Sequence, residues 1–350
     1  MTAQRRAQVV GTGLIGGSIG LALRNGGWHV TGSDRDRDRT ARALELGAID
    51  AVGEDPEAEL TFIAAPVGAI AEAASGRPGV ITDVGSVKAS IVAAADNPWF
   101  VGGHPMAGSE QDGIDGSRAD LFEGAVWVLT PVAATDPAAH ALVRSVVSSF
   151  GADVVELSPE RHDALVAVVS HVPHLTAASL MGLAAERSEE HAALLRLAAG
   201  GFRDMTRIAA GHPGIWPDIC VENADAIVEV LDRLVAELQS MRERVSSSDK
   251  VALYDALALA RSARLNLPGQ VAAVAEVAEV RVPVLDRPGV LAEITTLASE
   301  LGVNIHDLEI AHSSEGQAGV VLLLVDAALV DRLTVGLVAR GYRPTARSLE

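Results

Sequence analysis

The segment VVGTGLIGGSIGLAL, residues 9–23, restricts the fold more than any other part of the chain. Gly11, Gly13 and Gly16 follow a strand pattern ending at Val10 and open a helix pattern over Ile15–Arg24. In such a strand–turn–helix the first glycine permits the turn, the second admits a pyrophosphate and the third lets the helix pack on the strand. The helix N-terminus supplies N–H donors to the phosphates. The segment predicts a dinucleotide-binding fold, and a glycine turn without a ligand is the weaker interpretation.

An acidic residue after the next predicted strand, Trp28–Ser33, supports this prediction. Asp34 comes 18 residues after Gly16 and would accept hydrogen bonds from the adenosine ribose hydroxyls, which favours NAD over NADP. Arg35 and Arg37 follow at once and could reach a 2′-phosphate, so NADP stays an alternative. The residues expected to contact NAD are Gly11, Gly13, Leu14, Ile15, Gly16, Asp34, Arg35 and Pro66.

Residues 1–156 alternate short apolar runs with helical patterns, which predicts an α/β Rossmann-type, NAD-binding domain with a parallel sheet. The first strand is placed at Ala7–Val10. The later strands are predicted at Leu60–Ala64, Val80–Val84, Trp99–Val101, Val126–Thr130 and Asp153–Glu156, and the later helices at Arg39–Leu46 and Asp136–Phe150.

Residues 157–275 show another pattern, in which apolar side chains recur every three or four residues. This predicts an all-α substrate and dimerisation domain. Two of its segments, which begin HDALVAVVSHVPH and VENADAIVEVLDR, are nearly apolar over long stretches. Such helices usually bury both faces, either in a large core or in a subunit interface.

A third pattern covers residues 279–350. VRVPVL reads as a strand, AEITTLASELG as a helix, and VNIHDLEIAHSS and QAGVVLLLV as two further strands. DAALVDRLTVGLVARG then reads as a helix and YRPTARSL as a last strand. The order β-α-β-β-α-β is the ferredoxin-like plan.

Charge and cysteine content exclude several classes of partner. The 350 residues carry 28 basic and 46 acidic side chains, a net charge of −18, which argues against nucleic acid and anionic membranes. The single cysteine, Cys220, allows no internal disulfide or thiolate metal cluster and suggests a reducing, cytoplasmic location. The N-terminus lacks a signal-peptide pattern, and no run reaches the roughly 20 apolar residues of a membrane span.

Two predicted strand ends carry side chains suited to chemistry. VITDVGSVK places Ser86 and Lys88 after one strand, and FVGGHPMAGSE places His104 after another. Ligands of doubly wound sheets bind beyond the carboxyl ends of the strands. Ser86 could equally cap the following helix, and His104 alone could be an ordinary loop histidine.

The helical region adds two clusters. His162, His171 and His174 lie in ERHDALVAVVSHVPH without an acid at metal-ligand spacing, so no metal site is predicted. GGFRDMTRIAAGHPGIW places Asp204 between two arginines, of which Arg207 is the second. These side chains could form an exposed ion network, or a partly buried arginine could bind a carboxylate.

The motifs GxGxxG, DVGSVK, GGHPMAGSE, SHVPH and GGFRDMTRIA…W, in this order, resemble the prephenate and arogenate dehydrogenases of tyrosine biosynthesis. DRPGVLAEIT followed by GVNI looks like an ACT domain, an amino-acid-sensing module. The resemblance implies NAD-dependent oxidative decarboxylation of prephenate to 4-hydroxyphenylpyruvate, with a helical dimer interface and feedback by tyrosine through residues 279–350.

The resemblance also implies roles for single residues. His104 would accept the proton of the substrate 4-hydroxyl, and Ser86 would orient His104 and touch the nicotinamide. Arg207 would bind the ring carboxylate, with Asp204 holding its guanidinium, and His174 would contact the side-chain carboxylate. Trp216 would line the pocket, with Ser109 and Glu110 closing it; His162 and His171 fit structural roles. The residues implied in sensing tyrosine are Asp286, Gly289, Leu291, Asn304 and Ile305.

Three alternatives stay open. Arogenate dehydrogenase has the same chemistry on a transaminated substrate, although a histidine at position 174 suits a keto-acid side chain better than an ammonium. A non-catalytic NAD-binding sensor would not need Ser86, His104 and Arg207 together. Another dehydrogenase with an ACT domain, acting on homoserine or phosphoglycerate, would be expected to carry different motifs.

Overall fold

A computed structural model describes residues 4–108, 111, 113–188, 200–211, 213–266, 277–285, 287–312 and 318–348. The predicted site residues Ser109, Glu110 and Asp286 lie outside this described part. Two compact units are present, Met1–Glu243 and Arg244–Glu350, and each is considered by itself. The nucleotide-binding region and the helical region up to Glu243 fall together in the first unit, the rest of the helical region falls in the second, and the predicted three-domain division stays a prediction.

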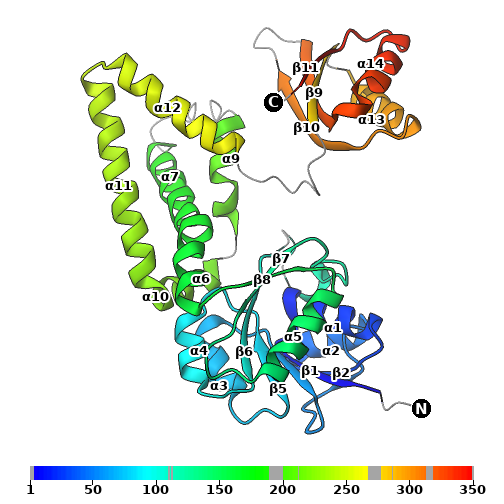
Figure 1. The fold of residues 1–350 in the computed structure, drawn as a ribbon, viewed down its shortest axis with the longest axis vertical. Coiled ribbons are helices and arrows are strands. Elements are labelled where there is room, and N and C mark those ends of the chain that lie inside the picture. Colours follow the sequence, from blue (N-terminus) through cyan, green and yellow to red (C-terminus); the bar gives the residue numbers. More distant parts are fainter. Residues whose placement is uncertain are drawn as a thin grey trace. The chain divides into compact units, whose positions relative to one another are not determined.

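An eight-stranded sheet forms the base of the first unit (Figure 1). Its strands in chain order are β1 (Arg6–Val10), β2 (His29–Ser33), β3 (Ala51–Val52), β4 (Leu60–Ile63), β5 (Val80–Asp83), β6 (Phe100–Pro105), β7 (Val126–Thr130) and β8 (Asp153–Glu156). The spatial order β3-β2-β1-β4-β5-β6-β7-β8 reverses direction between β1 and β4, which is where such sheets bind ligands. The predicted parallel pairing holds except between β6 and β7, which are antiparallel.

Helices pack on both faces of this sheet because its strands alternate their apolar side chains. Phe62 faces a core shared with α1 and α5, whereas the next residue, Ile63, faces a core shared with α3 and α4. The helices of this region are α1 (Leu14–Asn25), α2 (Arg37–Glu45), α3 (Ile70–Ala74), α4 (Ala89–Ala95) and α5 (Pro137–Ser149), with short 3₁₀ turns η1 (Val67–Ala69) and η2 (Ile114–Gly116). Asp36 and Asp136 accept hydrogen bonds from the first backbone N–H groups of α2 and α5, which explains where these helices begin.

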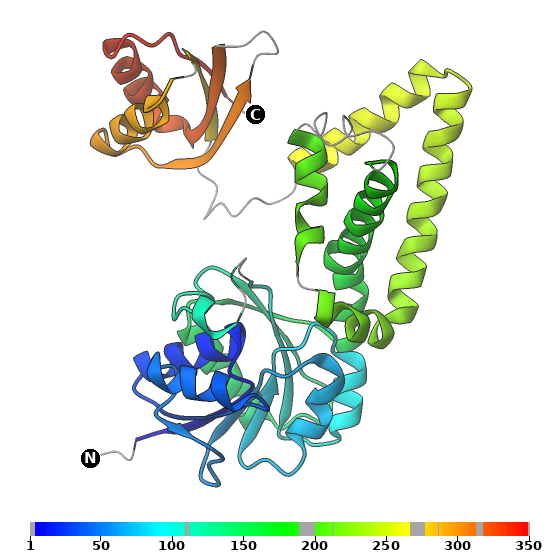
Figure 2. The ribbon, with the colours of Figure 1, turned by 180° about the vertical axis from the view of Figure 1, so that it is seen from behind.

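The helical region begins at Ser158, whose hydroxyl accepts the N–H of Arg161 at the start of α6. Its elements are α6 (Pro159–Val166), the π-helical turn η3 (Ala167–His171), α7 (Val172–Ser188), α9 (Gly200–Thr206), η4 (Arg207–Ala210), η5 (Pro213–Ile215), α10 (Trp216–Glu222) and α11 (Ala224–Ser246). Ala167, Val172 and Ile227 pack together where α7 and α11 lie side by side (Figures 1 and 2). The π-helical turn adds a residue to the helix and so changes which face His171 occupies relative to α6.

The apolar helices are largely exposed in the single chain, so a large internal core, one of the two sequence interpretations, does not account for them. The continuous helix Pro159–Glu186 has mean hydropathy 1.5 with 28% of its apolar window buried. By length and composition alone it could cross a membrane. Val228 is 53% exposed and Val235 50%, seven residues further along α11.

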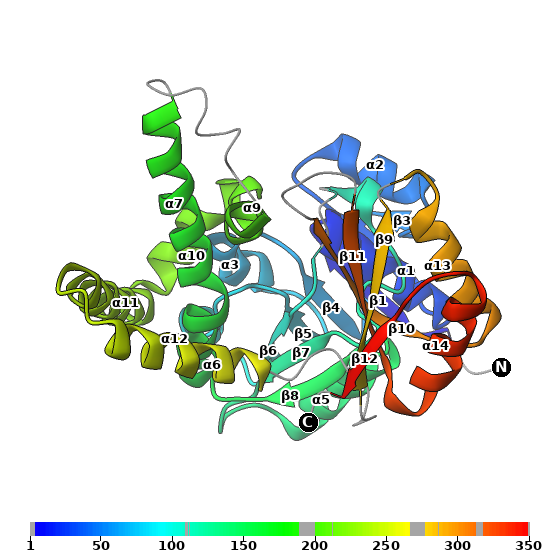
Figure 3. The same ribbon diagram turned by 90° about the horizontal axis from the view of Figure 1, so that it is seen from above.

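The second unit contains the predicted β-α-β-β-α-β order, preceded by helix α12 (Lys250–Leu265). Its elements are β9 (Val277–Leu285), α13 (Val290–Glu300), β10 (Ile305–His312), β11 (Ala318–Asp326), η6 (Ala327–Leu329), α14 (Val330–Ala339) and β12 (Thr345–Ser348). The strands form an antiparallel sheet in the order β10-β11-β9-β12, with α13 and α14 covering one face (Figure 3).

Candidate active site

The turn between β1 and α1 has the geometry that the glycine motif requires. Gly11 has a φ of +94°, and a side chain there would overlap the carbonyl of Ala64. A side chain at Gly16 would overlap the carbonyl of Gly11, so α1 packs closely on the turn. A methyl group at Gly13, in contrast, would meet nothing within 4 Å. The open space above Gly13 fits a pyrophosphate resting on the backbone.

Asp34 closes one side of this turn. Its carboxylate accepts hydrogen bonds from the N–H of Thr12 and of Asp36, over 2.8 and 2.9 Å, and the guanidinium of Arg39 lies 3.8 Å away. A cavity of about 570 Å³ lies beside it. Five of the predicted cofactor residues line this cavity: Gly11, Gly13, Asp34, Arg35 and Pro66. The residues present therefore fit the adenosine half of a dinucleotide.

A second cavity, of about 1170 Å³, connects the glycine turn with the helical region. Gly13 and Leu14 line it from the turn, and His174, Arg207 and Trp216 line it from the helices. The rings of His174 and Trp216 are stacked, with centroids 3.6 Å apart. Three predicted substrate residues thus share one cavity with two predicted cofactor residues.

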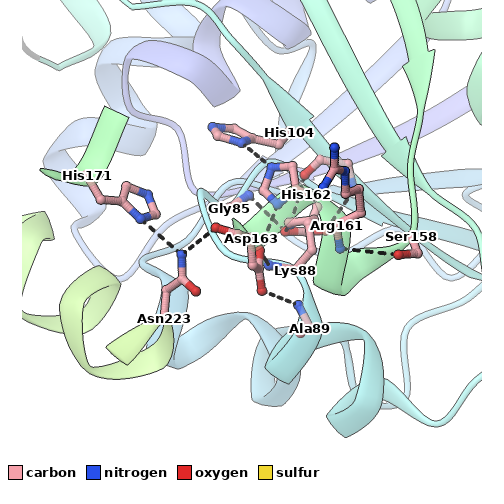
Figure 4. A network of polar contacts seen from close by, with 12 residues as sticks. Gly85, Lys88, Ala89, His104, Ser158, Arg161, His162, Asp163, His171 and Asn223 are labelled. Carbon is pink, nitrogen blue, oxygen red and sulfur yellow. Dashed lines mark hydrogen bonds and ion pairs between the residues drawn. The ribbon is translucent and has the colours of Figure 1, made fainter. Parts of the chain in front are cut away.

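His104 lies on β6, four residues before Gly108, which lines the second cavity. Its Nδ1 lies 2.8 Å from Nε2 of His162, and His162 Nδ1 lies 2.7 Å from Oδ1 of Asp163 (Figure 4). Asn223 donates from its amide to the carbonyl of Asp163 and lies 3.2 Å from Nδ1 of His171. Side chains of β6, α6 and η3 and of Asn223, the residue after α10, thus meet in one buried polar network.

A buried ion pair between Lys88 and Asp83 holds β6 next to this network. Lys88 is fully buried, and its ammonium donates to the carboxylate of Asp83 and to the carbonyl of Gly103. Asp83 also accepts the N–H of Gly103 over 3.0 Å. The residue immediately before His104 is therefore held through both of its backbone polar groups.

Burial sets the protonation of the histidines. It lowers the pKa of His104 well below 6.5, with smaller contributions in the same direction from His162, Lys88 and His171. It also lowers the pKa of His171 to about 4 and the pKa of His174 to a lesser degree. His104 is consequently neutral near pH 7 and able to accept a proton.

Comparisons with known proteins agree with this geometry. The family model "Prephenate dehydrogenase, nucleotide-binding domain" matches residues 19–156, and "Prephenate dehydrogenase, dimerization domain" matches residues 158–259. The prephenate dehydrogenase of Bacillus subtilis is 35% identical over 333 residues, which are 89% of this chain and 90% of that protein. The chain belongs to the prephenate dehydrogenase family.

Solved structures of this family show the same fold. The crystal structure of prephenate dehydrogenase from A. aeolicus with hydroxyphenyl propionate and NAD+ gives a TM-score of 0.72 at 30% identity, covering 76% of this chain and 99% of that one. Synechocystis arogenate dehydrogenase gives 0.64 at 31% identity, covering 74% and 98%. The chain is thus an NAD-dependent oxidoreductase of the prephenate dehydrogenase family, and the predictions of NAD and of enzymatic activity are confirmed.

His104 has a hydrogen-bond partner that the sequence did not predict. Nδ1 of His104 lies 2.8 Å from Nε2 of His162, because the first turn of α6 brings His162 up against β6, and the orienting role of Ser86 stays a prediction. The side chains of Asp204 and Arg207 are both exposed in the single chain, and the pairing of the two stays a prediction. Of the two interpretations of Arg207, an exposed side chain or a partly buried one, the single chain has the exposed side chain.

The remaining predicted residues differ in their placement. Ile15 is partly buried against the sheet core, and Gly16 is buried under the turn. Both residues therefore pack beneath the glycine turn and hold its position. In the second unit Gly289 has a φ of +92° at the start of α13, Leu291 and Ile305 pack on the core, and Asn304 is exposed.

Sequence reasoning missed the partners of His104. The sequence motifs predict no role for Asp163 or Asn223 and only a structural role for His162. Arg39, which lines both cavities, was also missed. The adjacent pair His162-Asp163, just after the helix start at Ser158, was the signal in the sequence that could have indicated this network. Nothing in the spacing of residues, however, connects this pair to His104, 58 residues earlier.

Proposed function

We propose that the chain catalyses the NAD-dependent oxidative decarboxylation of prephenate to 4-hydroxyphenylpyruvate in tyrosine biosynthesis. The observation that carries this proposal is the shared cavity, in which the glycine turn faces His174, Arg207 and Trp216. A planar, dianionic ring substrate matches this lining, because it offers an apolar face to the indole and carboxylates to the cationic and hydrogen-bonding groups.

Each of these side chains has a defined task in the proposed reaction. Nε2 of His104 accepts the proton of the substrate 4-hydroxyl, which raises the electron density on that carbon as its hydride leaves. Arg207 binds one carboxylate through its fork of N–H donors, and His174, held against Trp216, contacts the other. Bound NAD supplies the hydride acceptor, and loss of carbon dioxide makes the ring aromatic.

Gly11, Gly13, Asp34, Arg35 and Pro66 hold the cofactor in this proposal. Leu14 borders the nicotinamide end, since it lines the second cavity and not the first. Ser86, beyond the carboxyl end of β5, is proposed to contact the nicotinamide and to orient His104. Ser109 and Glu110 follow Gly108 in the chain and remain the proposed closing residues of the site.

Arogenate is the second candidate substrate, because the chain is also similar to Synechocystis arogenate dehydrogenase. The two substrates differ at the side chain, where one has a keto group and the other an ammonium. Following NADH formation with prephenate and with arogenate separates them. A kcat/KM at least tenfold higher for prephenate is expected, and a preference for arogenate would overturn the substrate assignment.

We further propose a cytoplasmic homodimer with an ACT-type regulatory domain that senses tyrosine. The exposed apolar residues of α11, such as Val228 and Val235, support a dimer interface in the region matched by the dimerization-domain model. The βαββαβ order of the second unit supports an ACT-type domain. Sedimentation at twice the chain mass and loss of activity on adding tyrosine are the expected results.

A further inference from the structure

The nitrogen of His104 that faces the protein belongs to a chain of buried hydrogen bonds (Figure 4). His104 Nδ1 lies 2.8 Å from His162 Nε2, and His162 Nδ1 lies 2.7 Å from Asp163 Oδ1. The exposed fractions are 9% for His104, 1% for His162 and 5% for Asp163. Because solvent scarcely reaches these groups, their hydrogen-bond partners in the protein determine which ring nitrogen carries each proton.

The backbone around Asp163 fixes the direction of these hydrogen bonds. Its Oδ1 accepts the N–H of Lys88 and its Oδ2 accepts the N–H of Ala89, each over 2.8 Å. Both oxygens therefore act as acceptors, so Nδ1 of His162 must donate to Oδ1. A neutral His162 then has its lone pair on Nε2, and Nδ1 of His104 donates to it. The lone pair of His104 is left on Nε2, which has no hydrogen-bond partner among the described residues.

We propose that Asp163, acting through His162, holds His104 in its Nδ1–H tautomer and balances the charge that His104 gains during turnover. This inference rests on the proposed function for its substrate. The O–H bond of the substrate hydroxyl breaks, an N–H bond forms at Nε2 of His104, and the ring becomes an imidazolium. The proton on Nδ1 stays in place, as in other carboxylate-backed histidine bases. His162 and Asp163 are positioning residues, since neither touches the substrate.

The surrounding charges explain why His104 needs such support. Burial lowers the pKa of His104 most, and His162, Lys88 and His171, which face it from neighbouring elements, lower that pKa further. The charge of Lys88 is matched by Asp83, to which its ammonium is bonded. Asp163 is the buried carboxylate that the hydrogen bonds connect to His104 through His162, so we expect it to offset the imidazolium charge.

Two substitutions of His162 separate positioning from packing. In His162→Gln the side-chain carbonyl can accept from Nδ1 of His104 while the amide N–H donates to Asp163, because the two polar atoms of glutamine are spaced like the two ring nitrogens. His162→Leu has a similar volume and can do neither. Both are made in the full-length chain, and thermal unfolding of each identifies any loss of fold.

The first readout does not depend on turnover. ¹⁵N NMR of the NAD-bound chain at pH 7 reports which nitrogen of His104 is protonated. The Nδ1–H form is expected in the wild type and in His162→Gln, and its loss is expected in His162→Leu. The same tautomer in all three proteins would overturn the proposal. A tautomer that changes as expected in a chain that does not oxidise prephenate would support this inference and overturn the proposed substrate instead.

The second readout is kinetic. Relative to wild type, kcat is expected to fall about tenfold in His162→Gln and about 100-fold or more in His162→Leu, with KM little changed, because a mispositioned base loses most of its contribution. Asp163→Asn removes the balancing charge, so the acidic limb of kcat moves to lower pH while its plateau falls. Equal kcat in the Gln and Leu variants, or an unmoved acidic limb in Asp163→Asn, would contradict the proposal.

Discussion

The carboxylate of Asp34 accepts the backbone N–H of Thr12 over 2.8 Å, so the acid at the end of β2 also holds the glycine turn that follows β1. In the proposed site the same group would accept hydrogen bonds from the ribose hydroxyls of NAD and repel a 2′-phosphate. One side chain thus shapes the turn, and we expect it also to select the cofactor.

Asp34→Asn tests this double role. Losing a charge-assisted hydrogen bond of about 1.5–3 kcal/mol should raise KM for NAD by tenfold or more, while KM for NADP falls because Arg35 and Arg39 remain nearby. Steady-state kinetics with each cofactor measure both effects. Asp136→Asn, at the cap of α5 away from both cavities, is the control and should change only stability. An unaltered NAD-to-NADP ratio in Asp34→Asn would show that specificity lies elsewhere.

The two glycines of the turn should respond differently to alanine. Gly11→Ala forces a side chain onto the Ala64 carbonyl at a φ of +94° and should cost about 2 kcal/mol or more of unfolding free energy. Gly13→Ala meets open space and should fold normally, yet bind NAD more weakly because its methyl enters the pyrophosphate space. Thermal melts and NAD titrations check this pair. Unchanged NAD affinity in a folded Gly13→Ala variant would contradict the placement of the pyrophosphate.

The strand and helix positions could be predicted because they depend on local patterns. The predicted strands Val126–Thr130 and Asp153–Glu156 match β7 and β8, and the glycine spacing located the cofactor turn. The partner of His104 could not be found in this way. His162 contacts His104 from 58 residues further along the chain. The π-helical turn that ends at His171 also changes the helix face on which the following residues lie, so ordinary helical spacing does not predict their positions.

His104→Asn should remove nearly all activity and leave NAD binding intact. Asparagine cannot take up the hydroxyl proton, and a lost general base costs about 10²–10⁴-fold in kcat. NADH formation and NAD titration measure the two effects separately. His140→Asn, on α5, is a matched control that should retain wild-type kcat. Substantial activity in His104→Asn would place the base on another residue.

His171 should make stability depend on pH. Its pKa is lowered to about 4, mainly by burial, so the unfolded chain binds its proton more readily than the folded chain. Its contribution is therefore complete above pH 6.5 and is lost as pH falls toward 4, by about 3 kcal/mol in total. Urea unfolding across this range should show a smaller loss in His171→Gln, which keeps an acceptor for Asn223 but does not titrate. Parallel curves for the two proteins would contradict the assignment.

Removing the second sheet should separate catalysis from regulation. The family models end at residue 259. The A. aeolicus structure matches 76% of this chain over 99% of its own length, so a protein with the catalytic fold can lack part of the present chain. A chain ending at Asn266 keeps α12 and should oxidise prephenate with a kcat within a few-fold of the full chain. Its inhibition by tyrosine should be lost, because the proposed sensing residues are absent. Inhibition curves for both chains give the answer, and equal inhibition would mean that tyrosine acts at the active site.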